Sequence, residues 1–216
     1  MDMAFVDYLA RWGHFLFGIT WIGLLYYFNL VQTEYFKEAD PAARNDAFVK
    51  LVPRALWWFR WGAMFTLLTG LVMLGIRGAG LTADITLGAV IAIVMFLNVW
   101  LVIWPNQRIV IGSNEQIKAG GQALPEAAAA APKAALASRT NVTLSIPMLY
   151  LMGSSAHYAS GDIASNSVGL IIGLVIVAAM EANALFGKQG PMTTVRGFIT
   201  CGLVLTVVFG GLLKFL

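Results

Sequence analysis

The chain has 216 residues, of which 59% are hydrophobic and 12% are charged, and its formal net charge at pH 7 is +3. Soluble domains contain roughly 45–50% apolar residues, so this composition and a mean hydropathy of +0.76 exclude a soluble protein and indicate an integral membrane protein. The basic residues are spread over loops rather than gathered into one patch, which argues against a nucleic-acid partner.

Six apolar stretches are long enough to cross a hydrocarbon core of about 30 Å, which requires about 20 residues. They predict an all-α fold, a polytopic transmembrane helix bundle of about six spans that forms a single integral membrane domain over residues 1–216. The lipid bilayer is therefore its main environment. In chain order the predicted spans are Tyr8–Val31, Arg54–Ile76, Ile85–Trp104, Asn141–His157, Val168–Phe186 and Val195–Phe215.

Two longer connections separate some of these spans. The connection 33–53 mixes charged and aromatic residues, which predicts a short amphipathic helix on the membrane surface. The connection 109–137 holds an alanine run interrupted by glycine and proline, which predicts a linker. Most Lys and Arg residues lie in the first, third and fifth connections, so these are predicted to be cytoplasmic in a bacterial inner membrane, with both termini on the other side.

Ionisable groups inside a span are costly and are therefore candidate functional groups. The only two histidines are His14 in the first span and His157 at the end of the fourth, and the predicted topology places both near the same membrane surface. Two imidazoles on facing helices can serve as the axial ligands of a b-type haem. This pattern makes His14 and His157 candidate metal ligands and haem b the candidate cofactor.

The sequence around His14 is compatible with such a slot. Gly18 and Trp21 follow at i+4 and i+7 and share its helix face, so the glycine leaves room for a flat ring and the indole forms a wall. Arg11, at i−3, is a candidate partner for a haem propionate. The alternative is that His14 hydrogen-bonds a neighbouring helix and Gly18 only aids helix packing.

Other polar residues leave further alternatives open. His157 follows Met148 and Met152, and thioether with imidazole suits copper. Arg60 and Glu181 lie at similar depth in the second and fifth spans, which suggests an ion pair that either fixes helix register or belongs to a proton or anion pathway.

A proline follows the third predicted span. Pro105 is expected to bend or end the helix there, and the neighbouring Asn98, Asn106 and Gln107 either satisfy the freed carbonyls or hold a ligand.

Three segments together resemble a known family. "RWGHFLFGITWIGLLYYF", "NVWLVIWPNQR" and "ASRTNVTLSIPMLYLMGSSAHY" are similar, in this order, to the membrane-embedded N-terminal domain of the bacterial urate hydroxylases, also called the urate oxidase N-terminal domain. The resemblance implies oxidation of urate towards 5-hydroxyisourate, with electrons passed to a cytochrome c. The matching positions are His14, Trp21, Gly23, Trp104, Pro105, Asn106, Gln107, Ser138, Arg139, Asn141, Ser145, Pro147 and His157.

Two departures from the family pattern keep a second hypothesis open. Members of this kind carry a C-terminal cytochrome c domain with a CxxCH motif, which this sequence lacks, so an external acceptor is expected. Thr140 stands where a histidine often occurs. The first hypothesis is therefore a urate-oxidising enzyme. The second is a haem b anchor or electron-transfer subunit, with a partner subunit in a larger redox complex and no urate activity.

Overall fold

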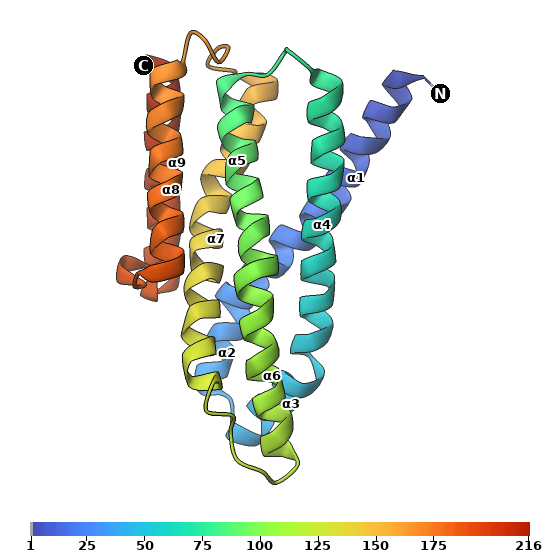
Figure 1. Ribbon diagram of the computed structural model, residues 1–216, viewed down its shortest axis with the longest axis vertical. Coiled ribbons are helices and arrows are strands. Elements are labelled where there is room, and N and C mark those ends of the chain that lie inside the picture. Colours follow the sequence, from blue (N-terminus) through green and yellow to red (C-terminus); the bar gives the residue numbers. More distant parts are fainter. Residues whose placement is uncertain (1) are drawn as a thin grey trace.

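The computed structural model describes residues 2–216, of which nearly all belong to helices (Figure 1). Two long rods are each built from three consecutive segments: α1 (Met3–Tyr26), the π-helix η1 (Tyr27–Gln32) and α2 (Thr33–Glu38), then α5 (Ala83–Leu97), the π-helix η2 (Asn98–Ile103) and α6 (Trp104–Lys118). The other long helices are α4 (Val52–Arg77), α7 (Ala127–His157), α8 (Ser167–Phe186) and α9 (Val195–Phe215). The short helices α3 (Pro41–Lys50) and η3 (Gly190–Thr193) lie in connections.

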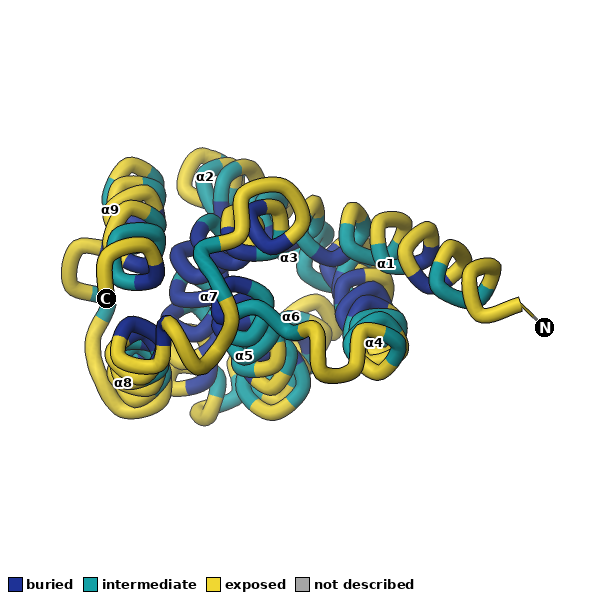
Figure 2. Tube along the Cα trace, turned by 90° about the horizontal axis from the view of Figure 1, so that it is seen from above, coloured by how far each residue is buried: buried dark blue, intermediate teal, exposed yellow. Residues whose placement is uncertain are grey.

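Five of the six rods are long and apolar enough to cross a membrane. The sixth, α7, has 31 residues, or about 46 Å at 1.5 Å per residue, but it is less apolar. Its Thr140, Asn141, Thr143 and Ser145 are fully buried, because α7 lies in the middle of the bundle and is covered by other helices (Figure 2). A central helix can carry polar groups since its neighbours, rather than lipid, meet them. The predicted all-α bundle of about six spans is confirmed.

Both termini lie at one end of the bundle, the connections 33–53 and 119–126 lie toward the other, and the turn 187–194 between α8 and α9 lies part of the way along the bundle from the termini (Figure 1). Lys37, Arg44, Lys50 and Lys188 are in these connections and further Lys and Arg residues flank them in the chain, so we call this the basic end and the opposite one the terminal end. An even number of passes follows from this arrangement. Which end faces the cytoplasm stays a prediction of the charge pattern.

The two long connections fold differently from each other. The amphipathic helix predicted within 33–53 is present as α3, which Asp46 ties to α6 because its Oδ1 accepts from Lys118 Nζ at 2.8 Å. The linker predicted over 109–137 is mostly helical, and only residues 119–126 lie outside helices. The alanine run has high helix propensity and joins α7 despite Pro132.

The third rod does not end at Pro105, so of the two expected effects, a bend or an end, the end was wrong. A proline inside a helix lacks the N–H that bonds four residues back, and its ring crowds that carbonyl. Here the wider π-helical turns of η2 immediately precede Pro105, and the rod continues to Lys118. A local change of helix type therefore accommodates the proline without a break.

Candidate functional site

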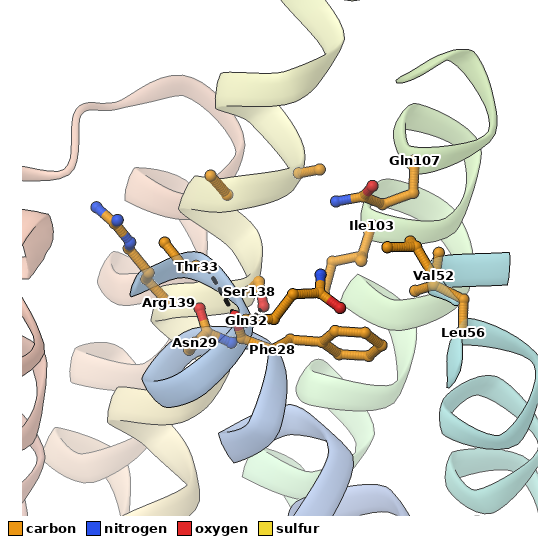
Figure 3. A pocket seen from close by; sticks show the side chains of 12 residues that line it. Phe28, Asn29, Gln32, Thr33, Val52, Leu56, Ile103, Gln107, Ser138 and Arg139 are labelled. Atoms are coloured by element: carbon orange, nitrogen blue, oxygen red, sulfur yellow. Dashed lines mark hydrogen bonds between the residues drawn. The ribbon is translucent and has the colours of Figure 1, made fainter. Parts of the chain in front are cut away.

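The two π-helical segments, η1 and η2, both pack against α7. π-helical turns are rare and are frequent at functional sites. Here η1 and η2 both contact α7, and both contribute to one cavity of about 100 Å³ near the basic end (Figure 3). It is lined by Phe28, Asn29, Gln32, Thr33, Val52, Leu56, Ile103, Gln107, Ala134, Ala135, Ser138 and Arg139. We call it the inner cavity.

The amide side chains of the inner cavity fall into two kinds. Asn29 is saturated on its donor side, because its Nδ2 donates to Leu25 O at 2.9 Å and to Ser138 Oγ at 2.8 Å. Gln32 and Gln107 extend toward the space between the helices (Figure 3), and the Oε1 of each is buried without a hydrogen-bond partner. Buried polar atoms are nearly always paired. These two acceptors line one cavity, where they can accept hydrogen bonds from a bound molecule with N–H or O–H groups.

Arg139 lines the inner cavity only with the stem of its side chain. Its guanidinium turns away from Gln107 (Figure 3) and donates to the side chain of Gln189 and to Met192 O, the latter at 3.2 Å. The arginine thus fastens α7 to the turn before α9. It does not supply a charge to the inner cavity in this arrangement.

A larger hollow adjoins the inner cavity on the side of α2 and α3. Its volume is about 540 Å³, and it shares Thr33, Gln107 and Ala135 with the inner cavity. Ligand sites commonly measure about 300–1,000 Å³. Lys37 and Arg44 also line this outer hollow, and a cleft lined by cations raises the local concentration of anions. The two spaces are adjacent, and of the two basic side chains in the outer hollow Lys37 pairs with Glu34 at 2.7 Å.

His14 is the predicted site residue whose geometry is most specific. Its Nδ1 lies 3.0 Å from Thr66 O and 3.2 Å from Thr69 Oγ1, both on α4. An Nδ1–H that donates to a backbone carbonyl leaves the Nε2 lone pair free, which is the usual arrangement of a metal-bound histidine. The ring lies against Gly70, where a Cβ would stand 3.1 Å from Cε1. The alternative, that His14 hydrogen-bonds a neighbouring helix, is therefore observed, and Nε2 is the atom that would bind a haem iron.

The other predicted haem residues are not gathered around His14. Gly18 is open, with no atom within 4 Å of where its Cβ would stand, as a slot requires. Trp21 is 1% exposed in the core. The Arg11 Nε pairs with Asp7 Oδ2 at 2.7 Å on an exposed face. His157 is exposed in the last turn of α7.

The two histidines occupy different parts of the bundle. Figure 1 shows the N-terminal half of α1 running beside α4 and away from the bundle, whereas the last turn of α7 lies next to α5. In residues 2–216 no hydrogen bond links the two histidines or joins both to a common residue. The residues present thus fit half of a two-histidine haem site, and His157 as the second ligand stays a prediction.

The predicted ion pair between Arg60 and Glu181 does not form in the described chain. The Arg60 guanidinium instead lies over the Trp104 ring at 3.9 Å and the Trp100 ring at 5.1 Å from their centroids. Glu181 Oε2 accepts a hydrogen bond from Asn98 Nδ2 at 2.8 Å. The two side chains face different neighbours, so the predicted ion pair was wrong.

Sequence reasoning named Gln107 as a candidate ligand-holding amide and overlooked Asn29 and Gln32. Their signal is visible in "YYFNLVQTEYF", where two amides at i and i+3 interrupt the end of an apolar run. They were absorbed into the end of the first predicted span. Both residues line the inner cavity because they belong to the π-helical segment η1, and the hydropathy pattern does not predict a π-helix.

Comparison with known proteins identifies one family. Residues 78–211 match the family described as urate oxidase N-terminal, which is more than half of the chain. The matched part contains Gln107, Ser138 and Arg139 of the inner cavity and also His157, whereas His14 and Gln32 precede it. No curated protein and no solved structure matches the chain.

Proposed function

Because the chain belongs to the urate oxidase N-terminal family, we propose that it binds urate within the membrane and oxidises it towards 5-hydroxyisourate, passing the electrons to a cytochrome c. The observation that carries the proposal is the inner cavity. There Gln107, from the family-matched region, and Gln32, from the preceding rod, present two buried acceptors that have no partner.

The chemistry of urate suits this cavity. Urate is a flat purine whose edges alternate N–H and C=O groups, and it is a monoanion at neutral pH. An amide side chain offers both an acceptor and two donors, so Gln32 and Gln107 can match such an edge. The inner cavity is small, and we expect the polar edge of urate to enter it while the rest of the ring occupies the outer hollow. Lys37 and Arg44 attract the anion there.

The reaction requires an electron acceptor. Urate and one water give 5-hydroxyisourate, two protons and two electrons, so two one-electron acceptors such as cytochrome c take the electrons. A haem bound by His14 would supply one-electron transfer. The chain itself supplies the free Nε2, oriented by the contact of Nδ1 with Thr66 O.

The second candidate function is a haem b anchor or electron-transfer subunit without urate activity. One observation favours it specifically: His14 is oriented as a metal ligand on α1, whereas the amides of the inner cavity lie nearer the basic end. A protein that binds haem but not urate would have this role.

Direct binding of urate tests the proposal. Equilibrium dialysis with the purified protein in lipid nanodiscs is expected to show urate binding that Gln107→Leu weakens at least about tenfold, since one ligand hydrogen bond contributes about 1.4 kcal/mol. Gln122→Leu, at an exposed position between α6 and α7, is the matched control. Urate-dependent reduction of added cytochrome c then tests the oxidation itself.

The outcomes separate the two functions. Equal urate affinity in wild type and Gln107→Leu would remove the inner cavity from the proposal. Absence of urate binding in a haem-containing preparation would favour the anchor or relay.

A further inference from the structure

A second polar cluster lies deeper in the bundle than the inner cavity. Asn98 of η2 donates through Nδ2 to Glu181 Oε2 of α8 at 2.8 Å and to Asn141 Oδ1 of α7 at 3.0 Å. Asn141 Nδ2 in turn donates to Met95 O of α5 at 2.9 Å. Asn98 is 1% exposed and Asn141 is fully buried. One carboxyl group and two amides thus connect four helical segments inside the membrane domain.

Glu181 has no cation to neutralise it. Among residues 2–216, no Lys, Arg or His nitrogen lies within 4.0 Å of its carboxyl oxygens, and Arg60 stacks on tryptophan rings instead. The charged groups and the histidine on the helices that contact α8 are Asp84, Lys133, Arg139, His157, Arg196 and Lys214. A carboxylate inside a span is costly unless it is paired or takes up a proton. With no ion pair formed, a proton is the remaining way to remove the charge.

The hydrogen-bond inventory of the cluster points the same way. Both hydrogens of the Asn98 amide are engaged, by Glu181 and by Asn141, while the Asn98 Oδ1 is buried without a partner. Asn98 Oδ1 is therefore a buried acceptor that no donor of the cluster reaches. An ionised carboxyl is acceptor-only, whereas a protonated one also donates. A proton on Glu181 would give the cluster one further donor.

We propose that Glu181 is an intramembrane proton-binding site and that Asn98 is its positioning residue. The proton binds a carboxylate oxygen to give the neutral carboxylic acid, with no other reactant. Glu181 is only partly buried, so the carboxyl can exchange protons with its surroundings, while Asn98 and Asn141 carry the change to η2 and α7. The inner cavity is lined from the same two segments, with Ser138 one turn from Asn141. The proposal does not depend on urate being the substrate.

Infrared spectroscopy of the full chain in lipid bilayers, recorded as a function of pH, tests this site. Near neutral pH, where ordinary carboxyl groups are ionised, wild-type protein is expected to show the band of a protonated carboxylic acid that disappears as the pH is raised further, and Glu181→Gln is expected to lose this band. Glu126→Gln, at an exposed position before α7, is the control that should keep it. Asn98→Leu removes the amide contact and is expected to shift both the frequency of the band and the pH at which it titrates.

Three results would overturn the proposal. The first is a wild-type spectrum without a carboxylic acid band near neutral pH. The second is a band that persists in Glu181→Gln. The third is an Asn98→Leu band identical to that of wild type, which would remove Asn98 as the positioning residue. If Glu181→Gln does not fold, Glu181→Asp keeps a carboxyl group, and its band must then shift because the shorter side chain does not reach Asn98.

Discussion

Two groups of buried polar side chains, one around Asp84 and one formed by Gln32, Asn98 and Gln107, differ in how completely their hydrogen bonds are satisfied. At the terminal end, Asp84 is 1% exposed and accepts from Ser154 Oγ at 2.6 Å, Ser160 N at 2.9 Å and Ser160 Oγ at 3.3 Å. Toward the basic end, Gln32, Asn98 and Gln107 each keep a buried acceptor without a partner. The first cluster is saturated, whereas the second group is not.

From this difference we predict that the first group is structural and the second is functional. Satisfied hydrogen bonds to a buried carboxylate hold helices together, here α5 to the end of α7 and the residues after it. Unsatisfied acceptors cost stability and persist where a ligand or proton completes them. We therefore expect substitutions at the terminal end to affect folding and substitutions toward the basic end to affect binding.

The largest expected effect concerns His14. It differs from the fully hydrogen-bonded Asp84 cluster because its Nε2 makes no hydrogen bond to residues 2–216 of the protein. His14→Ala is expected to abolish the Soret absorption of protein purified after growth with ample haem, since the oriented axial ligand is lost. The matched variant His157→Ala shows whether the exposed histidine is the second ligand. An undiminished Soret band in His14→Ala, or a colourless wild type, would contradict haem binding at His14.

The next largest effect is on stability. Asp84→Ala leaves the donors of Ser154 and Ser160 without their acceptor in a buried place, which is expected to cost about 3 kcal/mol. Unfolding of the purified protein by denaturing detergent measures this loss. Asp162→Ala, which removes only exposed contacts to Ser165, should cost much less. Equal losses in the two variants would show that the terminal cluster is not the structural one.

A smaller effect is expected at Gln32, where a substitution should change urate affinity more than stability. Gln32→Leu removes an unpaired buried acceptor, so stability should change by no more than about 0.5 kcal/mol, while urate affinity falls about tenfold. The same unfolding assay and equilibrium dialysis measure the two quantities. A stability loss as large as that of Asp84→Ala would remove the contrast between the two ends.

The smallest effect concerns the surface contact between α3 and α6. Hydrogen bonds from Lys118 and Lys50 hold the pKa of Asp46 below its ordinary value. A carboxyl whose pKa is depressed by folding contributes stability at neutral pH, and this contribution is lost as the pH falls through the folded-state pKa. Acidification should therefore release α3, seen as faster amide hydrogen exchange over Pro41–Lys50.

Two substitutions of aspartate by asparagine serve as controls for this surface contact. Asp46→Asn is expected to exchange quickly at every pH, whereas Asp40→Asn, outside the contact, should follow wild type. Exchange over α3 that does not depend on pH in wild type would show that the Asp46 contacts do not hold the helix.

The sequence by itself determined that the chain forms long apolar helices and gave the bounds of the last two, whereas the helices around the predicted linker 109–137 are longer than expected. The observed Val195–Phe215 has the predicted bounds, and Ser167–Phe186 differs by one residue, because the length and apolarity of a span are local properties set by the bilayer. The resemblance of short motifs also identified the family that the match over residues 78–211 confirms. Both inferences need no knowledge of which helices touch.

Only the tertiary structure decided which polar groups meet. The sequence predicted Arg60 and Glu181 at a similar depth in the membrane. In the structure the two side chains point in different directions, so Arg60 stacks on tryptophan rings and Glu181 accepts a hydrogen bond from Asn98. Likewise, the π-helical turns that bring Gln32 and Gln107 to one cavity have no simple hydropathy signature. Rotation about the helix axis and helix packing are set by contacts between distant segments, so a reading along the chain cannot supply them.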